Sequence, residues 1–199
     1  MGLAAVSAAV IGGVTARLVA PAATVGTSVT HFEAYSTSGQ PKLPVRKVVG
    51  SCLGASLTTA RVDAWRCRAH GTIYDPCYSV GRSAASVVCP DMDLNYATEI
   101  VVGGLPGRDR STLHAGSVLP WLLEVCETNG RCARCQRVAP TRPAANGLRL
   151  DFTCGGKLMG LGAFGLPDES TPLWTIAVGL VTPGAAAEVA VTHIRRAWT

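Results

Sequence analysis

Short apolar or alternating segments, separated by Gly- and Pro-rich turns, follow one another along the chain from about residue 44 onward. Regular short strands with such punctuation are typical of a β sandwich or barrel rather than of strand–helix–strand units. We therefore predict a mostly β, single-domain fold with low helix content. The longest helical candidate is Ala60–Cys67, where Asp63 could act as a late N-cap. The expected strand segments are Pro44–Val49, Ser86–Val88, Ala97–Val102, Val118–Val125, Gly147–Cys154, Leu173–Val181 and Ala187–Ile194.

The first residues have the pattern of an export signal. An apolar, small-residue run covers residues 3–16, and Ala20-Pro21-Ala22 follows as a small-x-small cleavage pattern. The run is shorter than the roughly 20 residues that cross a bilayer, so a membrane anchor through an uncleaved leader is the second interpretation. We expect a leader over residues 1–22, a Thr/Ser/Gly-rich spacer over 23–44 and a folded domain over 45–199.

Composition agrees with a packed, exported domain. Apolar residues make up 48% of the chain and charged residues 16%, which excludes the signature of disorder. The net charge of +5 comes from 18 basic against 13 acidic residues, and the basic residues are scattered rather than clustered. A nucleic-acid partner is not expected, because its footprint requires clustered basic side chains with interleaved aromatics.

Eight cysteines lie after the leader, and an even number in an exported chain predicts four structural disulfides. Turn positions suggest the pairs. Cys132 and Cys154 flank a turn-rich stretch, and Cys67 and Cys77 flank a short loop with Gly71, which leaves two further pairs. The predicted pairing is Cys52–Cys89, Cys67–Cys77, Cys126–Cys135 and Cys132–Cys154.

Two other uses of the cysteines are possible. Cys132 and Cys135 form a Cys-x-x-Cys, and with Cys126 and Cys154 nearby they could hold zinc. A thioredoxin-like redox role would need a βαβ setting, which the pattern lacks. No metal and no cofactor are predicted, because oxidising compartments convert such thiols to disulfides.

Catalytic alternatives rest on few residues. The stretch 50–54 has the outline of a nucleophile elbow with Cys52 as nucleophile, although no helix is expected after it. Asp91, Asp93 and Asp75 could supply a hydrolytic carboxylate pair, and the acids in reserve are Glu99, Asp151 and Glu124. Asp75 and Asp91 each adjoin a proline, where aspartates commonly bond turn backbone.

The histidines and tryptophans favour structural roles. His31, His70, His114 and His193 are isolated from one another and show no metal-ligand spacing. Trp65, Trp121, Trp174 and Trp198 could stack a sugar or a base, but large aromatics more often fill a β core. We expect the tryptophans to be core residues, with Trp198 holding the last strand in place.

Several short motifs follow one another in a fixed order along the chain. They are Gly50-Ser51-Cys52, Arg61-Val62-Asp63-Ala64-Trp65-Arg66-Cys67, Ile73-Tyr74-Asp75-Pro76-Cys77-Tyr78, Pro120-Trp121, Asn129-Gly130-Arg131-Cys132 and Pro172-Leu173-Trp174-Thr175. Over roughly residues 45–199 this order resembles a family of exported actinobacterial proteins of unknown function. The resemblance implies a secreted or lipoprotein-like location and no particular chemistry. Cys126 and Cys135 look like additions to the usual cysteines of that family, which fits their pairing with each other, and Leu53 stands where an aromatic is expected.

The sequence thus predicts a secreted or cell-surface accessory or binding module for an extracellular or cell-wall ligand. A secreted hydrolase using Cys52 or the Asp91/Asp93 pair is the first alternative. The sensor domain of a surface receptor is the second.

Overall fold

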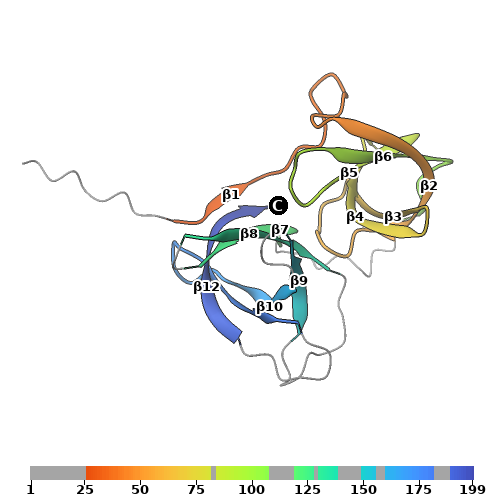
Figure 1. Cartoon of the computed structure of the whole chain (residues 1–199). Helices are drawn as coiled ribbons and strands as arrows, with labels where there is room; N and C mark the ends of the chain where they lie inside the picture. Colours follow the sequence, from red (N-terminus) through yellow and green to blue (C-terminus); the bar gives the residue numbers. More distant parts are fainter. Residues whose placement is uncertain are drawn as a thin grey trace, which may run out of the picture.

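The computed structural model describes residues 26–81, 84–107, 119–127, 130–138, 149–155, 160–181 and 189–199, and the described part contains strands and no helix. The mostly β class is therefore confirmed. Figure 1 shows the strands gathered into two barrels that lie side by side, with the C terminus between them. The strands are β1 (Ser28–Thr30), β2 (Val45–Ala55), β3 (Ala64–Ala69), β4 (Thr72–Tyr78), β5 (Ser86–Pro90), β6 (Ala97–Val102), β7 (Leu122–Cys126), β8 (Cys132–Arg137), β9 (Leu150–Cys154), β10 (Leu161–Asp168), β11 (Thr175–Leu180) and β12 (Val189–Trp198).

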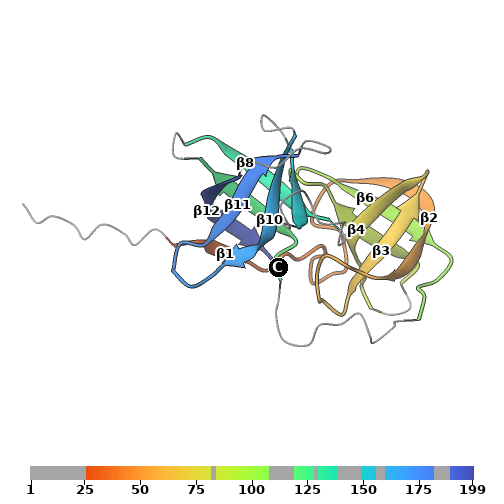
Figure 2. The same ribbon diagram turned by 90° about the horizontal axis from the view of Figure 1, so that it is seen from below.

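The first barrel contains β2 to β6, and each strand pairs antiparallel with the next along the chain. Five alternating strands bring the first and the last into the same direction, so the closing pair β2–β6 is parallel. Closure leaves neither edge of this sheet open, which removes the usual site of strand-to-strand aggregation. Figure 2 shows this barrel beside the second one.

The second barrel contains β7 to β12 and is also an up-and-down ring. Its strands pair antiparallel in chain order, and six of them allow an antiparallel closing pair, β12–β7. The long β12 pairs with β11 through its first half and with β7 through its second half. Its last residues also pair parallel with β1.

Three groups of buried side chains stabilise this arrangement. One fills the first barrel around Trp65, Ile100 and Val87, and one fills the second around Phe152 and Ile194. The third lies between the barrels and combines side chains from both with the N-terminal segment. Burying this much apolar surface joins the barrels into one packed unit.

Aromatic contacts define the junction. Phe32 from the N-terminal segment lies with its ring centroid 5.4 Å from that of Tyr78 and 5.5 Å from that of Trp121. Tyr78 belongs to β4 of the first barrel, and Trp121 precedes β7 of the second. Tilted and edge-to-face rings at such distances add to the energy of burial.

Residues 26–44 are part of the packed structure, although the sequence indicated a spacer. β1 pairs with β12, and the N–H of Phe32 donates to the carbonyl of Thr199 at 2.9 Å. Phe32 and Ala34 are buried. The Thr/Ser-rich composition of this segment concealed it, because β1 is stabilised by pairing rather than by its own apolar pattern. The predicted leader, residues 1–22, lies outside the described residues.

Besides β1, four strands were not expected from the pattern: β3, β4, β8 and β10. The helix predicted over Ala60–Cys67 is wrong, because residues 64–69 form β3. That strand is paired on both sides, with β2 and with β4. Pairing across a closed barrel overrides the weak helical preference of so short a segment.

All eight cysteines are disulfide-bonded and none is free, but each of the four predicted pairings is wrong. The bonds are Cys52–Cys67, Cys77–Cys89, Cys126–Cys132 and Cys135–Cys154. Each joins neighbouring strands of one barrel. A small β fold with four disulfides is typical of an oxidising, extracellular environment.

Strand register explains the error. In the tight β3–β4 hairpin Cys67 faces Tyr74, so Cys77 lies three residues beyond the opposing position. Cys135 faces Cys154 on β9 and Leu123 on β7, which excludes Cys132–Cys154 and Cys126–Cys135. β2 and β5 are not neighbours in the first barrel, which excludes Cys52–Cys89.

In the described part of the chain, no helix is long and apolar enough to span a bilayer.

Candidate functional site

A cleft of about 450 Å³ lies where the first barrel meets β8 and β9 of the second. The first barrel contributes side chains from β2 to β6, including Tyr74 on β4 and Tyr96 before β6. The second barrel contributes Gln136, Arg137 and Thr153. The volume falls within the range of small-molecule sites. The cleft therefore exists only when both barrels are in place.

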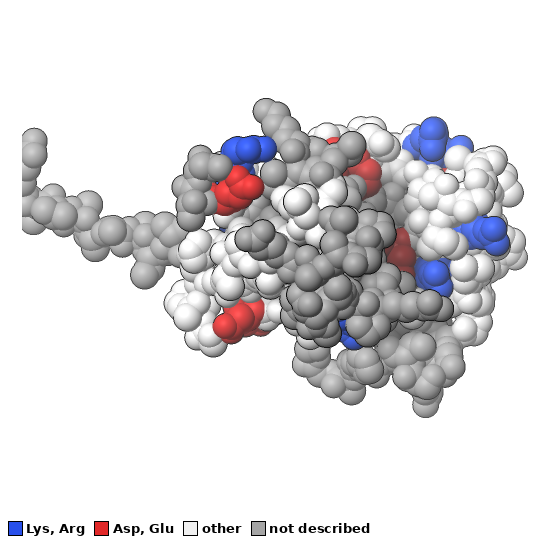
Figure 3. Space-filling view, turned by 60° about the horizontal axis from the view of Figure 1, so that its bottom comes forward, with Lys and Arg blue, Asp and Glu red and all other residues white. Residues whose placement is uncertain are grey.

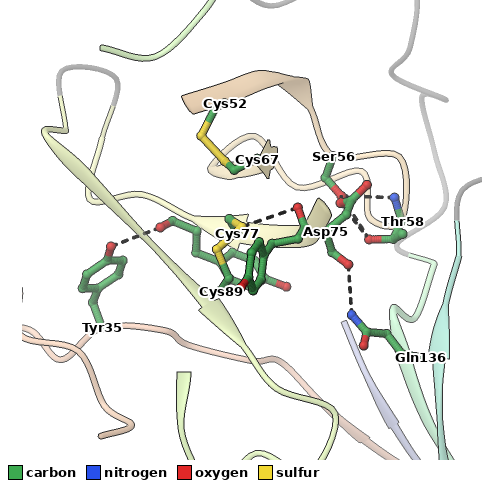
Figure 4. Close-up of a disulfide and its surroundings, with 11 residues drawn as sticks. Tyr35, Cys52, Ser56, Thr58, Cys67, Asp75, Cys77, Cys89 and Gln136 are labelled. Atoms are coloured by element: carbon green, nitrogen blue, oxygen red, sulfur yellow. Dashed lines mark hydrogen bonds between the residues drawn. A yellow bond between two sulfur atoms is a disulfide. The ribbon is translucent and has the colours of Figure 1, made fainter. Parts of the chain in front are cut away.

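Asp75 organises one wall of this cleft (Figure 4). Its carboxylate accepts hydrogen bonds from the hydroxyl of Thr58 at 3.1 Å, from the hydroxyl of Ser56 and from the N–H of Leu57 at 3.0 Å. The Ser56 hydroxyl oxygen in turn accepts from the N–H groups of Thr58 and Thr59. The loop after β2 is thus held to β4 by side-chain bonds.

Burial raises the pKa of the Asp75 carboxyl above its ordinary value of 3.8. Hydrogen bonds from Ser56, Leu57 and Thr58, and the charge of Arg66, oppose this without reversing it. Removal from water penalises the charged form of an acid more than these partners stabilise it. Figure 4 shows the carboxylate directed toward Ser56 and Thr58, and the backbone carbonyl directed toward Gln136.

Hydrogen bonds cross the junction beside the cleft. The side-chain amide of Gln136 donates to the carbonyl oxygen of Asp75 at 3.0 Å, and Arg137 donates to the carbonyl oxygen of Thr58 at 3.4 Å. Further along β8, Arg134 donates to the carbonyl oxygen of Asp93. β8 is therefore attached to the first barrel at several points, which fixes the width of the cleft.

Three arginines line the cleft: Arg46 on β2, Arg66 on β3 and Arg137 on β8. Burial lowers the pKa of Arg137, with Arg149 acting in the same direction and Asp151 and Asp75 opposing. On the face drawn in Figure 3, basic side chains are spread over the part that the first barrel forms.

A second hollow, of about 460 Å³, lies beside β2 and β6 and includes Tyr35, Lys47 and Glu99. Its charged groups are already paired. The Lys47 ammonium lies 3.3 Å from a Glu99 carboxylate oxygen, and the Ser86 hydroxyl donates to the same carboxylate. Because these two charges neutralise each other, they attract a charged ligand only weakly. The cleft between the barrels is therefore the better candidate for a binding site.

The hypothesis of Cys52 as nucleophile is wrong, because its sulfur is bonded to Cys67. The expected elbow is absent too, since Gly50, Cys52 and Gly54 all lie within β2. Gly50 has a packing role there: a Cβ at this position would lie 2.3 Å from the carbonyl oxygen of Arg68. The Gly-Ser-Cys motif is thus part of the barrel wall.

The zinc and redox hypotheses for Cys132 and Cys135 are also wrong, because these residues are in disulfides with Cys126 and Cys154. Glu124, Cys126 and Cys132 do lie close enough to suggest a metal site among the described residues. Two of the three are joined by a disulfide, however, and a disulfide sulfur is not the thiolate that binds zinc.

Asp91 and Asp93, the predicted carboxylate pair, do not both line the cleft. Asp91 lines it and Asp93 does not. Asp91 accepts a hydrogen bond from the N–H of Asn95 at 3.0 Å, which is the turn role expected from the sequence. Asp75 was expected to bond its own turn and instead bonds the loop after β2. Asp75 and Asp91 are the carboxylates that the cleft brings together.

The remaining predicted residues lie away from the cleft. His31, His70 and His193 are exposed, and His114 lies outside the described residues. Trp65, Trp121 and Trp198 are buried, as expected for core tryptophans, and Trp174 is half-buried against the second barrel. Four residues of the lining were not singled out from the sequence: Arg46, Tyr96, Gln136 and Arg137. Asp75 and Asp91 were named as candidate carboxylates, and Arg66 and Tyr74 only as members of motifs. The cleft as a whole could not be predicted, because its residues converge from distant strands.

Comparison of the chain with family models, with curated proteins and with solved structures gives no match in any of the three.

Proposed function

We propose that this protein is an exported, extracytoplasmic binding module whose ligand occupies the cleft between the two barrels. The observation that carries the proposal is the cleft itself, which both barrels line with polar and aromatic side chains and which has the volume of a small-molecule site. The four disulfides and the expected leader support a location outside the cytoplasm.

The cleft is suited to binding because it is held open in advance. Its walls are fixed by the bonds of Asp75, by the Gln136 contact and by disulfides on β4 and β8. A preformed site loses little conformational entropy when a ligand enters. Tyr74 and Tyr96 provide ring faces of the kind that pack on sugars. A cell-wall saccharide is the ligand that we propose.

The test is retention of the oxidised chain from residue 23 to residue 199 on an insoluble actinobacterial cell-wall preparation. Thr72 is exposed and lines the cleft, so Thr72→Trp should fill the cleft without disturbing the core. Thr171→Trp is the matched control, since Thr171 is exposed on the loop between β10 and β11. We expect Thr72→Trp to reduce retention at least tenfold and Thr171→Trp to leave it unchanged. Equal retention of both variants, or none by the wild type, would contradict the proposal.

A carbohydrate hydrolase is a second candidate, because Asp75 and Asp91 line the same cleft and burial raises the pKa of Asp75. Paired carboxylates with one raised pKa are the usual machinery of glycoside hydrolysis. Against this, the Asp75 carboxylate already accepts three hydrogen bonds from the loop after β2. Release of reducing sugar by the wild type but not by Asp91→Asn would favour the hydrolase. No release by the wild type would exclude hydrolysis of the cell-wall preparation used.

A further inference from the structure

Among the described residues, the cleft carries an excess of positive charge without ion-pair partners. Its lining includes three arginines and two aspartates, which leaves a formal charge of +1. Within the described ranges, none of Arg46, Arg66 and Arg137 has a carboxylate oxygen within ion-pair distance. Some basic side chains elsewhere do form ion pairs, as in Lys42–Glu33, Arg61–Asp63 and Arg149–Asp151. The unpaired arginines converge on the cleft from three strands.

Arg66 shows the feature most clearly. Its Nε is buried and has no hydrogen-bond partner among the described residues. A buried N–H donor without an acceptor costs about 1–3 kcal/mol. A functional role, or a water or ion that supplies the acceptor, is among the explanations for such a group. Thr59 Oγ1, the Tyr78 hydroxyl and Trp121 Nε1 are likewise buried without a partner among the described residues, but of the four only Arg66 lines the cleft. The arrangement therefore indicates that something outside the chain supplies an acceptor.

Strand geometry directs Arg66 toward the cleft. On one side of β3 the register shifts between Trp65 and Cys67, so that Arg66 lies opposite the two residues Asp75 and Pro76. On the other side it pairs with Gly54, next to a second irregularity. Bulges of this kind re-aim a side chain and are common beside binding sites.

Neither aspartate of the lining forms an ion pair with these arginines, although Asp75 interacts with Arg66 and Arg137 at longer range. The Asp75 carboxylate is directed to Ser56 and Thr58, from which it accepts hydrogen bonds (Figure 4). Asp91 accepts from the N–H of Asn95. A guanidinium offers N–H donors in a planar fork that matches a carboxylate or a phosphate group. Three such groups in one cleft select for an oxyanion.

We infer that the cleft binds the oxyanion group of an acidic saccharide, a carboxylate or a phosphate, through Arg46, Arg66 and Arg137. This inference rests on the proposed function and specifies its ligand. A neutral sugar would leave the arginines unpaired, whereas an anionic one supplies the missing acceptor. Electrostatic attraction also makes the affinity fall as salt is added.

The experiment compares three probes with the same ring: glucose, glucuronate and glucose 6-phosphate. Their affinities for the oxidised chain are measured by calorimetry or NMR titration at low and at high salt. We expect at least one charged sugar to bind tenfold or more tightly than glucose, with the advantage reduced by salt. The tighter of the two charged probes identifies carboxylate or phosphate as the preferred group. Equal affinity for glucose, or no binding of either charged sugar, would overturn the inference.

Charge-removing variants locate the contact. Arg66→Gln should weaken binding of the charged sugar at least tenfold. Arg68→Gln on the same strand is its control, because Arg68 is exposed and does not line the cleft. Arg46→Gln is a second test that leaves the core untouched, since Arg46 is exposed at the start of β2. If Arg46→Gln and Arg66→Gln bind as tightly as Arg68→Gln, the assignment is wrong.

The outcome can be separated from that of the proposed function. In one case, the wild type is retained on the cell wall, Thr72→Trp is not, and glucose binds as tightly as glucuronate. That result would overturn the assignment of an oxyanion ligand and leave the proposed function standing. Binding of charged sugars that depends on Arg66, without retention of the wild type on the wall, would overturn the cell-wall ligand alone.

Discussion

Asp75 connects the loop after β2, the strand β4 and the second barrel. Its carboxylate holds Ser56, Leu57 and Thr58, and its carbonyl oxygen accepts from Gln136. A single residue can hold these segments together because a carboxylate accepts several hydrogen bonds at once. The Asp-Pro pair drew attention to this position in the sequence. The identity of its partners could not be predicted, since they come from residues 17 to 61 positions away.

Asp75→Ala tests this role. The variant leaves the N–H of Leu57 and the hydroxyls of Ser56 and Thr58 without their acceptor, which should lower the free energy of unfolding by about 1–3 kcal/mol. Asp91→Ala is the control, because that carboxylate accepts the N–H of Asn95 in an exposed turn and should cost less. Urea unfolding monitored by tryptophan fluorescence gives the comparison. A loss for Asp75→Ala no greater than for Asp91→Ala would contradict the assigned role.

The same variant has a pH signature. Because burial raises the pKa of Asp75 in the folded state, the unfolded chain loses this proton first as the pH rises. The difference in unfolding free energy between the wild type and Asp75→Ala should therefore become smaller as the pH rises from 3.8 through the raised pKa. A gap that widens over that range would show that hydrogen bonding outweighs burial.

At the scale of elements, the sequence predicted strands where apolar residues form clear runs. It missed β3, β4 and β8, in which charges and cysteines interrupt the apolar pattern, and β10, which contains two glycines and a proline. β6 matches its expected bounds, whereas β3 and β4 were missed. His70 and Gly71, both with positive φ, form the two-residue turn between these strands. Positive φ at both positions is what a type I′ hairpin turn requires, and His adopts it more readily than most residues. If His70-Gly71 had been interpreted as a two-residue hairpin turn, Cys67 would have been placed opposite Tyr74, which excludes the predicted Cys67–Cys77 bond.

β2 allows a test of strand packing with a matched pair of glycines. A Cβ at Gly50 would lie 2.3 Å from the backbone oxygen of Arg68 and 2.8 Å from the Ile100 side chain, whereas a Cβ at Gly54 meets nothing within 4 Å. Gly50→Ala should therefore lower the free energy of unfolding by about 1–3 kcal/mol through overpacking, and Gly54→Ala by much less. Urea unfolding of both variants measures the difference. Equal effects would mean that β2 and β3 are not packed as described.

At the scale of the molecule, two closed barrels are joined by a third group of buried side chains. Phe32, Tyr78 and Trp121 come from three separate parts of the chain, and their contact fixes one barrel against the other. The sequence predicted a β barrel or sandwich and core tryptophans, but not a second barrel or the cleft at the junction. Both depend on which strands close on each other, and that is decided by long-range pairing.

The central claim is that ligand binds between the barrels, and hydrogen exchange tests it most directly. Soluble saccharide fragments released from the cell wall are added to the oxidised chain, and amide exchange is followed by mass spectrometry. We expect slower exchange at the amides of residues 72–75 in β4 and of residues 136–138 at and just after the end of β8, which line the cleft. Residues 161–164 of β10, outside the cleft lining, should be unchanged. Protection confined to other strands, or no protection at all, would contradict the account.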